Sequence, residues 1–354
     1  MAIGLDDVVA AETALSDVDG LAGRLIIRGH SLDELAGRIQ FEGVAALLLD
    51  RAFEKALTPE ALGKARVDMF FRFAPDLAAL SKMEVFDATR AAIARIEDGD
   101  DLETALQLMA APAVLVPALI RARSGLEPVA PDPKLSHAAD ILRMLMDKRP
   151  TAGEVQALAT YLVTVSDHGL NASTFAARVV ASTQAGLVSS MLAALGALKG
   201  PLHGGAPGPV LDMIDAVGTP SQAGPVLRDM LNHGERLPGF GHRIYRVRDP
   251  RADALKNALA GLPPSPRLDL ALAVEATALE LLKQRKPDRP LETNVEFFTA
   301  LLLDALGFPR DAFTAVFATG RMAGWIAHSR EQAISGRMIR PKSLYVGPVP
   351  QKAA

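Results

Sequence analysis

The chain has 354 residues, of which 49% are hydrophobic, 22% charged and 5% aromatic, and its formal net charge is −3. A chain of this length buries a large core and predicts two domains. The sequence contains no cysteine, which excludes disulfides, thiolate catalysis and thiolate zinc sites. Because the net charge is weakly negative, an anionic ligand must be held by local arginine clusters.

The amino-terminal segment gives no indication of export. It is acidic and lacks the basic start and apolar run of a signal peptide. The most apolar stretch, residues 108–120, is shorter than the roughly 18 residues of a membrane span and is interrupted by Pro112 and Pro117. We therefore expect a soluble cytoplasmic protein with no membrane partner.

Helical periodicity dominates the chain. Residues 23–29 (GRLIIRG) are the one clear strand candidate and suggest a small N-terminal hairpin. A capping box at 151–154 (TAGE) predicts the start of a helix, and residues 268–285 repeat the helical spacing of apolar side chains. Another long helix is predicted to begin at Asp311 and to end at Gly336. The fold class is therefore mostly α.

Two histidines in glycine-rich segments are the strongest functional signal. His203 lies in GPLHGG (200–205) and His242 in LPGFGHRIYRVRDPRA (237–252), and a carboxylate, Glu296, follows in TNVEFF. Glycines let the backbone approach a ligand closely, and neither histidine lies on an amphipathic pattern that would simply bury it. Two imidazoles and a carboxylate suffice to remove a carbon-bound proton and to polarise two carbonyls.

Arginines gather directly after the second histidine, which suits a small polyanionic substrate. Nucleic acid is an unfavoured ligand because the chain has few aromatic residues and no basic excess. No metal-ligand spacing, Walker sequence or GxGxxG motif occurs, so we expect no metal site and no nucleotide cradle. The other histidines are interpreted as structural: His30, His137, His233 and His328.

The chain resembles the citrate synthase family over essentially its whole length. The segments that carry this resemblance are RLIIRGHSLDELA, LSHAADILRML, DHGLNASTFAARVVAST, GPLHGGAP, GFGHRIYRVRDPRA, NVEFFTALLLDALGFP and GRMAGWIAHSREQ…IRPKSLYVGP. Each stretch alone is moderate evidence, whereas the whole set in this order is highly specific. The resemblance implies the citrate synthase fold and an acyltransferase of the tricarboxylic acid cycle that condenses acetyl-CoA with oxaloacetate.

The resemblance also implies roles for the three residues of the catalytic set. His203 would hydrogen-bond the thioester oxygen as the enol forms, and His242 would polarise the ketone of oxaloacetate. We expect helix termini near His203 to keep it neutral. Glu296 would be the base, although most family members have aspartate there. Its extra methylene adds up to about 1.5 Å of reach, so the backbone compensates, the rate suffers or the substrate differs.

The remaining site residues are also implied by the resemblance. His168, Asn171, Arg251, Arg321 and Arg340 would bind the carboxylates of oxaloacetate, and Arg340 would act in the site of a partner subunit. Two further arginines would contact coenzyme A: Arg246 and Arg289. The coenzyme A thioester is a substrate, and no metal or redox cofactor is expected.

The resemblance predicts two helical domains and a homodimer. The large domain would comprise residues 1–204 and 308–354, and the small domain residues 205–307, with His203 at the hinge. Closure would assemble the site and exclude water.

Two alternatives stay open. One is 2-methylcitrate synthase using propionyl-CoA, because one methyl group is worth only about 1–3 kcal/mol in an apolar pocket. The other is a ligand-binding paralogue with little catalysis, for which glutamate at position 296 is the only support.

Overall fold

The structure is a computed structural model that describes residues 8–204, 207–242, 244–245, 247–287 and 291–348. It begins with a three-stranded antiparallel sheet made of β1 (Ser16–Asp19), β2 (Arg24–Ile27) and β3 (His30–Ser31). Ser16 pairs with Ile27 and Asp19 with Arg24, so residues 20–23 form the turn between β1 and β2. The predicted strand is confirmed, and β3 adds a short third strand to the expected hairpin.

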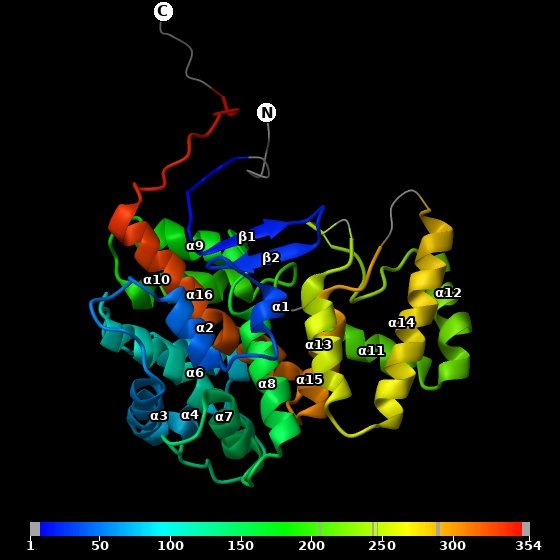
Figure 1. The fold of residues 1–354 in the computed structure, drawn as a ribbon, viewed down its shortest axis with the longest axis horizontal. Coiled ribbons are helices and arrows are strands. Elements are labelled where there is room, and N and C mark those ends of the chain that lie inside the picture. The colour runs from blue at the N-terminus through cyan, green and yellow to red at the C-terminus, as the bar shows by residue number, and fades with distance from the viewer. Residues whose placement is uncertain (1–7, 205–206, 243, 246, 288–290, 349–354) are drawn as a thin grey trace, which may run out of the picture.

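Almost everything after the sheet is helical (Figure 1). The first ten helices are α1 (Leu32–Leu35), α2 (Phe41–Leu48), α3 (Pro59–Phe73), α4 (Leu77–Leu80), α5 (Val85–Ile93), α6 (Leu102–Arg123), α7 (His137–Met146), α8 (Ala152–Val165), α9 (Ala172–Ala181) and α10 (Leu187–Leu198). The later helices are α11 (Pro207–Val217), α12 (Ala223–Asn232), α13 (Pro250–Ala260), α14 (Pro266–Arg285), α15 (Val295–Ala305) and α16 (Phe313–Ser335). Single 3₁₀ turns lie at Ala74–Asp76, Pro220–Gln222 and Arg310–Ala312. The prediction of a mostly α-helical fold is confirmed.

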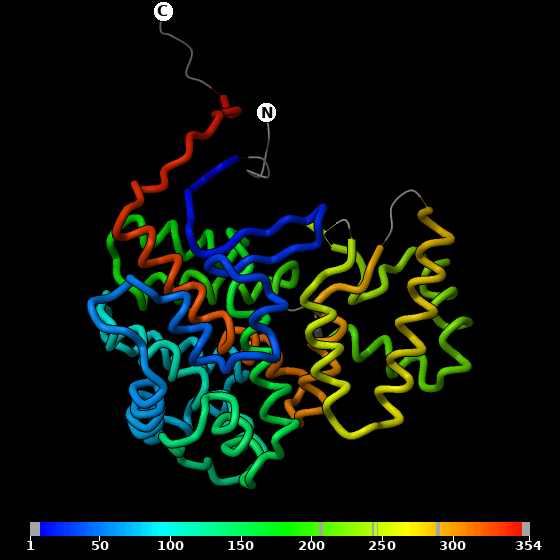
Figure 2. The backbone as a smooth tube through the Cα atoms, viewed as in Figure 1, coloured from blue at the N-terminus to red at the C-terminus, as the bar shows by residue number. Residues whose placement is uncertain are grey.

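The helices form two groups that meet along α8, α13 and α15. Figure 2 shows α11, α12 and α14 on one side and α2 to α10 with α16 on the other. Helix α13 packs against both α8 and α15, while α11 packs against α15 and α12 against α14. Helix α16 runs through the middle of the larger group and contacts α6, α8, α9 and α10.

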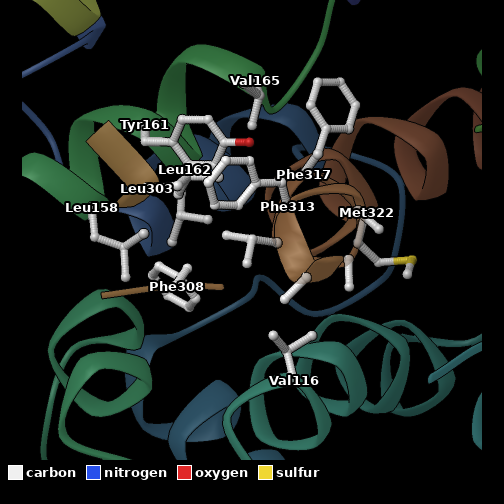
Figure 3. Packing of buried hydrophobic residues seen from close by; sticks show 14 of the residues in the cluster. Val116, Leu158, Tyr161, Leu162, Val165, Leu303, Phe308, Phe313, Phe317 and Met322 are labelled. Atoms are coloured by element: carbon white, nitrogen blue, oxygen red, sulfur yellow. The ribbon is translucent and has the colours of Figure 1, made fainter. Parts of the chain in front are cut away.

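Large apolar side chains fill the space where α8 meets α16 and the end of α15. Figure 3 shows Leu158 and Leu162 of α8 beside Phe313 of α16 and Leu303 of α15, with Val116 of α6 below them. All five side chains are buried. This packing fixes α15 and α16, which carry Glu296 and Arg321, in position against α8.

Helix α6 corrects one prediction. Pro112 and Pro117 do not interrupt the apolar stretch, because the helix is continuous from Leu102 to Arg123. Each proline removes one backbone donor and crowds the preceding turn, and packing against α3, α5, α7 and α16 offsets that cost. Among the described residues, α6 is the one helix long and apolar enough to cross a membrane, but 83% of its most apolar window is buried inside the protein.

The predicted helix ends are mostly accurate. Thr151 and Glu154 form the expected capping box at the start of α8, and α14 spans the predicted helix at 268–285. Helix α16 ends before Gly336 as predicted. It begins at Phe313 rather than at Asp311, which lies instead in the preceding 3₁₀ turn.

Two glycines of α16 set how closely this helix approaches the end of α8. A Cβ atom at Gly324 would lie 2.2 Å from the carbonyl oxygen of Ser166, and one at Gly320 would lie 2.6 Å from Cγ2 of Val165. Arg321 lies between these glycines, and its Nε donates to the carbonyl of Val165. The glycines therefore determine the depth at which the Arg321 guanidinium is buried.

We expect Gly324→Ala to lower the free energy of unfolding by about 1–3 kcal/mol, because the new methyl group cannot fit beside the Ser166 carbonyl. Urea denaturation measures the change. The matched control is Gly43→Ala in α2, where the position is exposed and the methyl group meets only the Ile39 side chain at 3.6 Å. This control should be neutral or stabilise by up to about 1 kcal/mol. Equal stabilities of the two variants would contradict the close approach.

Candidate active site

The ring of His242 is oriented by the backbone that follows it. Nδ1 accepts hydrogen bonds from the amides of Ile244 at 2.9 Å and Tyr245 at 3.0 Å. A nitrogen that accepts two N–H groups carries no proton, so the neutral ring bears its proton on Nε2. Burial, helped by the positive charge of Arg251, lowers the pKa of His242 to about 4. The ring is therefore a neutral donor at physiological pH.

His168 and Tyr245 lie against this ring. The ring centroids of His168 and His242 are 5.9 Å apart, and those of His242 and Tyr245 are 4.8 Å apart. The Tyr245 hydroxyl is 3.2 Å from Nε2 of His168. Burial, reinforced by Arg251 and Arg321, holds the pKa of His168 well below its usual value. The structure thus brings together two of the predicted site histidines, whereas Tyr245 was not singled out in the sequence.

Arg251 is paired with Asp249, two residues before it. Nε donates to Oδ1 at 3.0 Å and Nη2 to Oδ2 at 2.8 Å, and both side chains are buried. Nη2 also lies 3.2 Å from Nε2 of His242; because a guanidinium cannot accept, this is a close approach of two donors and not a hydrogen bond when Nε2 carries the proton. Two nitrogens of the Arg251 guanidinium are therefore bonded to Asp249, and only the rest of the guanidinium is available for a ligand. Asp249 could have been noticed in the sequence as the acid of the DPR segment.

The start of α15 is fixed to the His242 segment by backbone hydrogen bonds. The amide of Gly241 donates to the Glu292 carbonyl at 2.7 Å, and the amide of Asn294 donates to the Gly239 carbonyl at 3.0 Å. Asp249 Oδ2 accepts from the amide of Val295 at 3.2 Å. The segment before His242 and the segment before Glu296 are consequently one local unit.

Glu296 is the second residue of α15, and its amide donates to the capping side chain of Asn294 at 3.0 Å. Burial raises the pKa of Glu296 to about 7, and the negative Asp249 acts in the same direction. The positive charges of Arg251 and Arg321 oppose this rise. A carboxyl group with a pKa near 7 has the proton affinity that suits a general base at neutral pH.

His203 follows α10 and is oriented by Ser173 of α9. Its Nε2 lies 2.7 Å from the Ser173 hydroxyl, which also accepts a hydrogen bond from Nε1 of Trp325 at 3.1 Å. The same hydroxyl is 2.8 Å from Oδ1 of Asn171. Burial and the charge of Arg321 lower the pKa of His203 to about 4. The Nδ1 side of the ring is left for a ligand.

Asn171 caps α9. Its Oδ1 accepts from the amides of Ser173 and Thr174, both at 3.1 Å, and its Nδ2 donates to the Gly169 carbonyl at 3.3 Å. The amide group is therefore engaged by the backbone that follows His168. Neither this cap nor the bond from Ser173 to His203 was derived from the sequence.

Arg321 is a buried positive charge without an ion-pair partner among the described residues. Its side chain is 1% exposed, its guanidinium lies 4.7 Å from the centre of the Phe317 ring, and its Nε is bonded to the Val165 carbonyl. Burial lowers the pKa of Arg321 to about 10, and the nearby Arg251 contributes to this shift. Such a group remains cationic and favours an anionic ligand.

A network behind the site supports α16. Nε2 of His328 is 3.2 Å from Oδ2 of Asp167, and its Nδ1 is 2.9 Å from Nη1 of Arg178. Arg178 is in turn paired with Glu331 at 2.7 Å. Burial raises the pKa of Asp167, but His328 and Arg321 outweigh burial and leave this pKa below its usual value. His328 is thus structural, as predicted, although its ionic partners were not foreseen.

An open cleft of about 670 Å³ extends from His242 between α12 and α14. Apolar side chains such as Leu237, Phe240 and Leu291 line it, together with the acidic Glu235 and three basic side chains: Arg236, Arg285 and Lys286. Among the described residues, no group of three or more histidine and carboxylate side chains could hold a metal ion. The cleft suits an organic anion with both apolar and phosphate parts.

Three predicted arginines are not placed with the others. Arg340 is exposed in the extended segment after α16, which leads away from the body of the molecule (Figure 1). Arg246 and Arg289 lie outside the described residues.

Comparison with known proteins identifies the family. The family model described as "Citrate synthase, C-terminal domain" matches residues 4–342. A citrate synthase from Acidithiobacillus ferridurans is 34% identical over 97% of this chain and 95% of its own length. A 2-methylcitrate synthase from Mycobacterium tuberculosis is 37% identical over 97% of this chain and 90% of its own. The crystal structure of citrate synthase from Thermotoga maritima matches with a TM-score of 0.86 and 32% identity, covering 99% of this chain and 97% of that one.

The chain therefore belongs to the citrate synthase family, whose enzymes form a carbon–carbon bond between acetyl-CoA and oxaloacetate. The resemblance noted in the sequence is confirmed over nearly the whole chain, and so are the fold class and the acyltransferase activity that it implied.

We expect Glu296→Gln to stabilise the ligand-free protein above neutral pH. The carboxyl has a pKa near 7 when folded and about 4.3 when unfolded. The native state is therefore penalised once this group must ionise, by up to about 4 kcal/mol above pH 7. Urea unfolding at pH 8 should favour the variant, and the difference should shrink as the pH falls and vanish below about pH 4. A difference that does not change with pH would contradict the burial of this carboxylate.

Proposed function

We propose that this member of the citrate synthase family condenses acetyl-CoA with oxaloacetate and releases citrate and coenzyme A. The proposal rests on one combination of three groups. Glu296 is a carboxyl group with a pKa near 7, and His242 is a neutral imidazole donor. Arg321 is a buried guanidinium without an ion-pair partner among the described residues. Together they offer a base, an electrophilic activator and an anchor for an anion.

Oxaloacetate is the ligand proposed for the two buried arginines. Arg321 would bind one carboxylate, and the part of Arg251 not occupied by Asp249 would bind the same or the other carboxylate, with a bond from His168. The Nε2 proton of His242 would then point at the ketone oxygen and make its carbon electrophilic. Asn171, which was predicted to contact the substrate, is proposed to act by holding the backbone after His168.

Proton removal from the acetyl group is assigned to Glu296. The single proton of the Ser173 hydroxyl, which points to Oδ1 of Asn171 at 2.8 Å in the ligand-free protein, would turn to Nε2 of His203 when the thioester binds. Nδ1 would then carry the ring proton and donate to the thioester oxygen as the enol forms. The enol carbon attacks the ketone of oxaloacetate, and hydrolysis of the citryl thioester releases coenzyme A. These steps need no metal or redox cofactor.

Coenzyme A is proposed to occupy the cleft between α12 and α14, where the basic side chains would meet its phosphates. Arg246 and Arg289 are proposed as further contacts to it. The cleft belongs to the proposed small domain, residues 205–307, and its closure on residues 1–204 and 308–354 would exclude water from the enol.

A homodimer is proposed as the active unit. Helices α9 and α10 pack side by side and leave small side chains at least partly exposed, among them Ala172, Ala176, Ala193 and Gly196. Such a face lets the helices of a second copy approach closely. The segment that carries Arg340 leads away from its own subunit, as a residue acting in a partner's site requires.

Thiol release from acyl-CoA tests the function directly. We expect oxaloacetate-dependent release of coenzyme A from acetyl-CoA, with a larger kcat/KM than for propionyl-CoA, and several orders of magnitude less turnover by Glu296→Gln because that variant lacks the base. The chain contains no cysteine, so the protein adds no thiol background.

Two outcomes of this assay would change the assignment. A larger kcat/KM for propionyl-CoA would make the protein a 2-methylcitrate synthase, the activity named in one of its relatives. Folded protein that turns over neither substrate would favour a ligand-binding paralogue.

Subunit mixing tests the role of Arg340. Arg340→Ala and His242→Ala should each be inactive. In a mixed dimer the first subunit keeps His242 and receives Arg340 from the second, so activity should return to about a quarter of the wild-type value after random exchange. Mixing His203→Ala with His242→Ala is the matched control and should restore nothing, since neither residue is shared. Absence of recovery in the first mixture would exclude action in the partner's site.

A further inference from the structure

The turn between β1 and β2 lies directly against the segment that carries His242. A Cβ atom at Gly20 would lie 2.3 Å from the carbonyl oxygen of Ile244 and 2.8 Å from its Cγ2. A Cβ atom at Gly23 would lie 2.8 Å from Cγ2 of Val247. Distances below 3.0 Å are not tolerated by real Cβ atoms, so the two ends of this turn are in tight contact with Ile244 and Val247.

The conformation of Gly20 does not explain why glycine is there. Gly20 is absent from the glycines with positive φ, whereas Gly23 has φ 62°. Alanine at position 20 would therefore suffer no backbone strain. What excludes a side chain at Gly20 is the space taken by the Ile244 peptide.

The peptide unit that lies against Gly20 joins the Ile244 carbonyl to the Tyr245 amide, and that amide orients the His242 ring by donating to Nδ1 at 3.0 Å. The amide of Ile244 donates to Nδ1 of His242 at 2.9 Å, while the carbonyl of Ile244 lies against Gly20. A displacement of Ile244 by the turn is therefore transmitted to the ring through two hydrogen bonds, those from the Ile244 and Tyr245 amides. Such a displacement would also change the tautomer of the ring, because the proton stays on Nε2 only while Nδ1 accepts these hydrogen bonds.

The sheet also contacts the segment that carries His168, the second histidine proposed to bind oxaloacetate. Ser16 at the start of β1 accepts a hydrogen bond from the amide of Gly169 at 3.1 Å. Cγ2 of Val18 lies 3.2 Å from where a Cβ at Gly169 would be. Gly169 directly follows His168, so one small sheet contacts the segments of both histidines.

We propose that the β1–β2 hairpin positions His242, and that Gly20 is the residue through which it acts. The inference rests on the proposed function only for its kinetic consequence. Gly20 contacts no substrate and is a positioning residue: its missing side chain lets the Ile244 peptide hold the imidazole with Nε2–H aimed at the ketone.

Gly20→Ala tests the proposal. A shift near 1 Å at a reacting group costs on the order of a hundredfold in rate, so we expect kcat to fall at least about tenfold and KM for oxaloacetate to rise. KM for acetyl-CoA should stay within about twofold, because the cleft between α12 and α14 is not in contact with the turn. A general loss of structure would instead change both KM values and the active fraction.

The matched control is Gly29→Ala, in the same sheet. Its φ of 86° strains an alanine, but nothing lies within 4 Å of the added methyl group. This variant should lose some stability and keep wild-type kcat and KM. If Gly20→Ala does not fold, Gly23→Ala serves instead, and adding Val247→Ala should restore its kcat by removing the atom it meets. Failure of that rescue would overturn the proposal.

A measurement without substrate separates this inference from the proposed function. In ¹⁵N-histidine-labelled protein, the His242 signals, assigned with His242→Gln, should show one neutral tautomer with the proton on Nε2. Gly20→Ala should shift them toward a mixture of tautomers, and Gly29→Ala should not. Wild-type protein without turnover would refute the proposed function while this shift still supports the hairpin's role. Unchanged His242 signals, or unchanged kinetics in Gly20→Ala, would overturn the role itself.

Discussion

The structure around the site depends on burying two guanidinium groups, those of Arg251 and Arg321. Asp249 is paired with Arg251, whereas Arg321 has no ion-pair partner among the described residues. Burial opposes protonation of the three histidines. The positive field of the guanidinium groups acts in the same direction. It also opposes the rise of the Glu296 pKa that burial causes. Burial thus keeps the imidazoles neutral and raises the pKa of Glu296 to about 7, while the buried positive charge adds to the first effect and limits the second.

Such an arrangement costs stability, and the surrounding helices offset the cost. A buried guanidinium is tolerated only when hydrogen bonds and packing replace its water. For Arg321 the replacements are the Val165 carbonyl and the Phe317 ring, and both are in reach because Gly320 and Gly324 allow α16 close to α8. An oxaloacetate carboxylate would supply the missing counter-charge, so ligand binding should also stabilise the fold.

Much of this could be predicted from the sequence, and what could not has physical reasons. Some predictions rested on local patterns in the sequence. These patterns are the glycines around His203 and His242, the DPR segment, and the capping box at Thr151, which begins a helix as predicted. The contacts that orient these groups are not local: Ser173 lies 30 residues from His203, and Ile244 meets Gly20 across the chain. The prolines of α6 were misjudged because tertiary packing overrides helix propensity. His203 has a lowered pKa because of burial and Arg321 rather than helix termini, and burial is invisible in a sequence.

The position of Glu296 follows from how its backbone is held. Asn294 bonds to the Gly239 carbonyl, Gly241 bonds to the Glu292 carbonyl, and Asp249 bonds to the amide of Val295. These bonds tie the base to the His242 segment and leave the start of α15 little room to move back for a longer side chain. Arg321 and Ser173 stand on α16 and α9, outside that unit. Under the closure proposed above, compensation for the extra methylene would lie in the distance between the two groups of helices, with the acyl group between Glu296 and His203. If the gap between the two groups of helices is slightly wider in the closed state, the longer glutamate side chain would reach the acyl group as the shorter aspartate does in a narrower site.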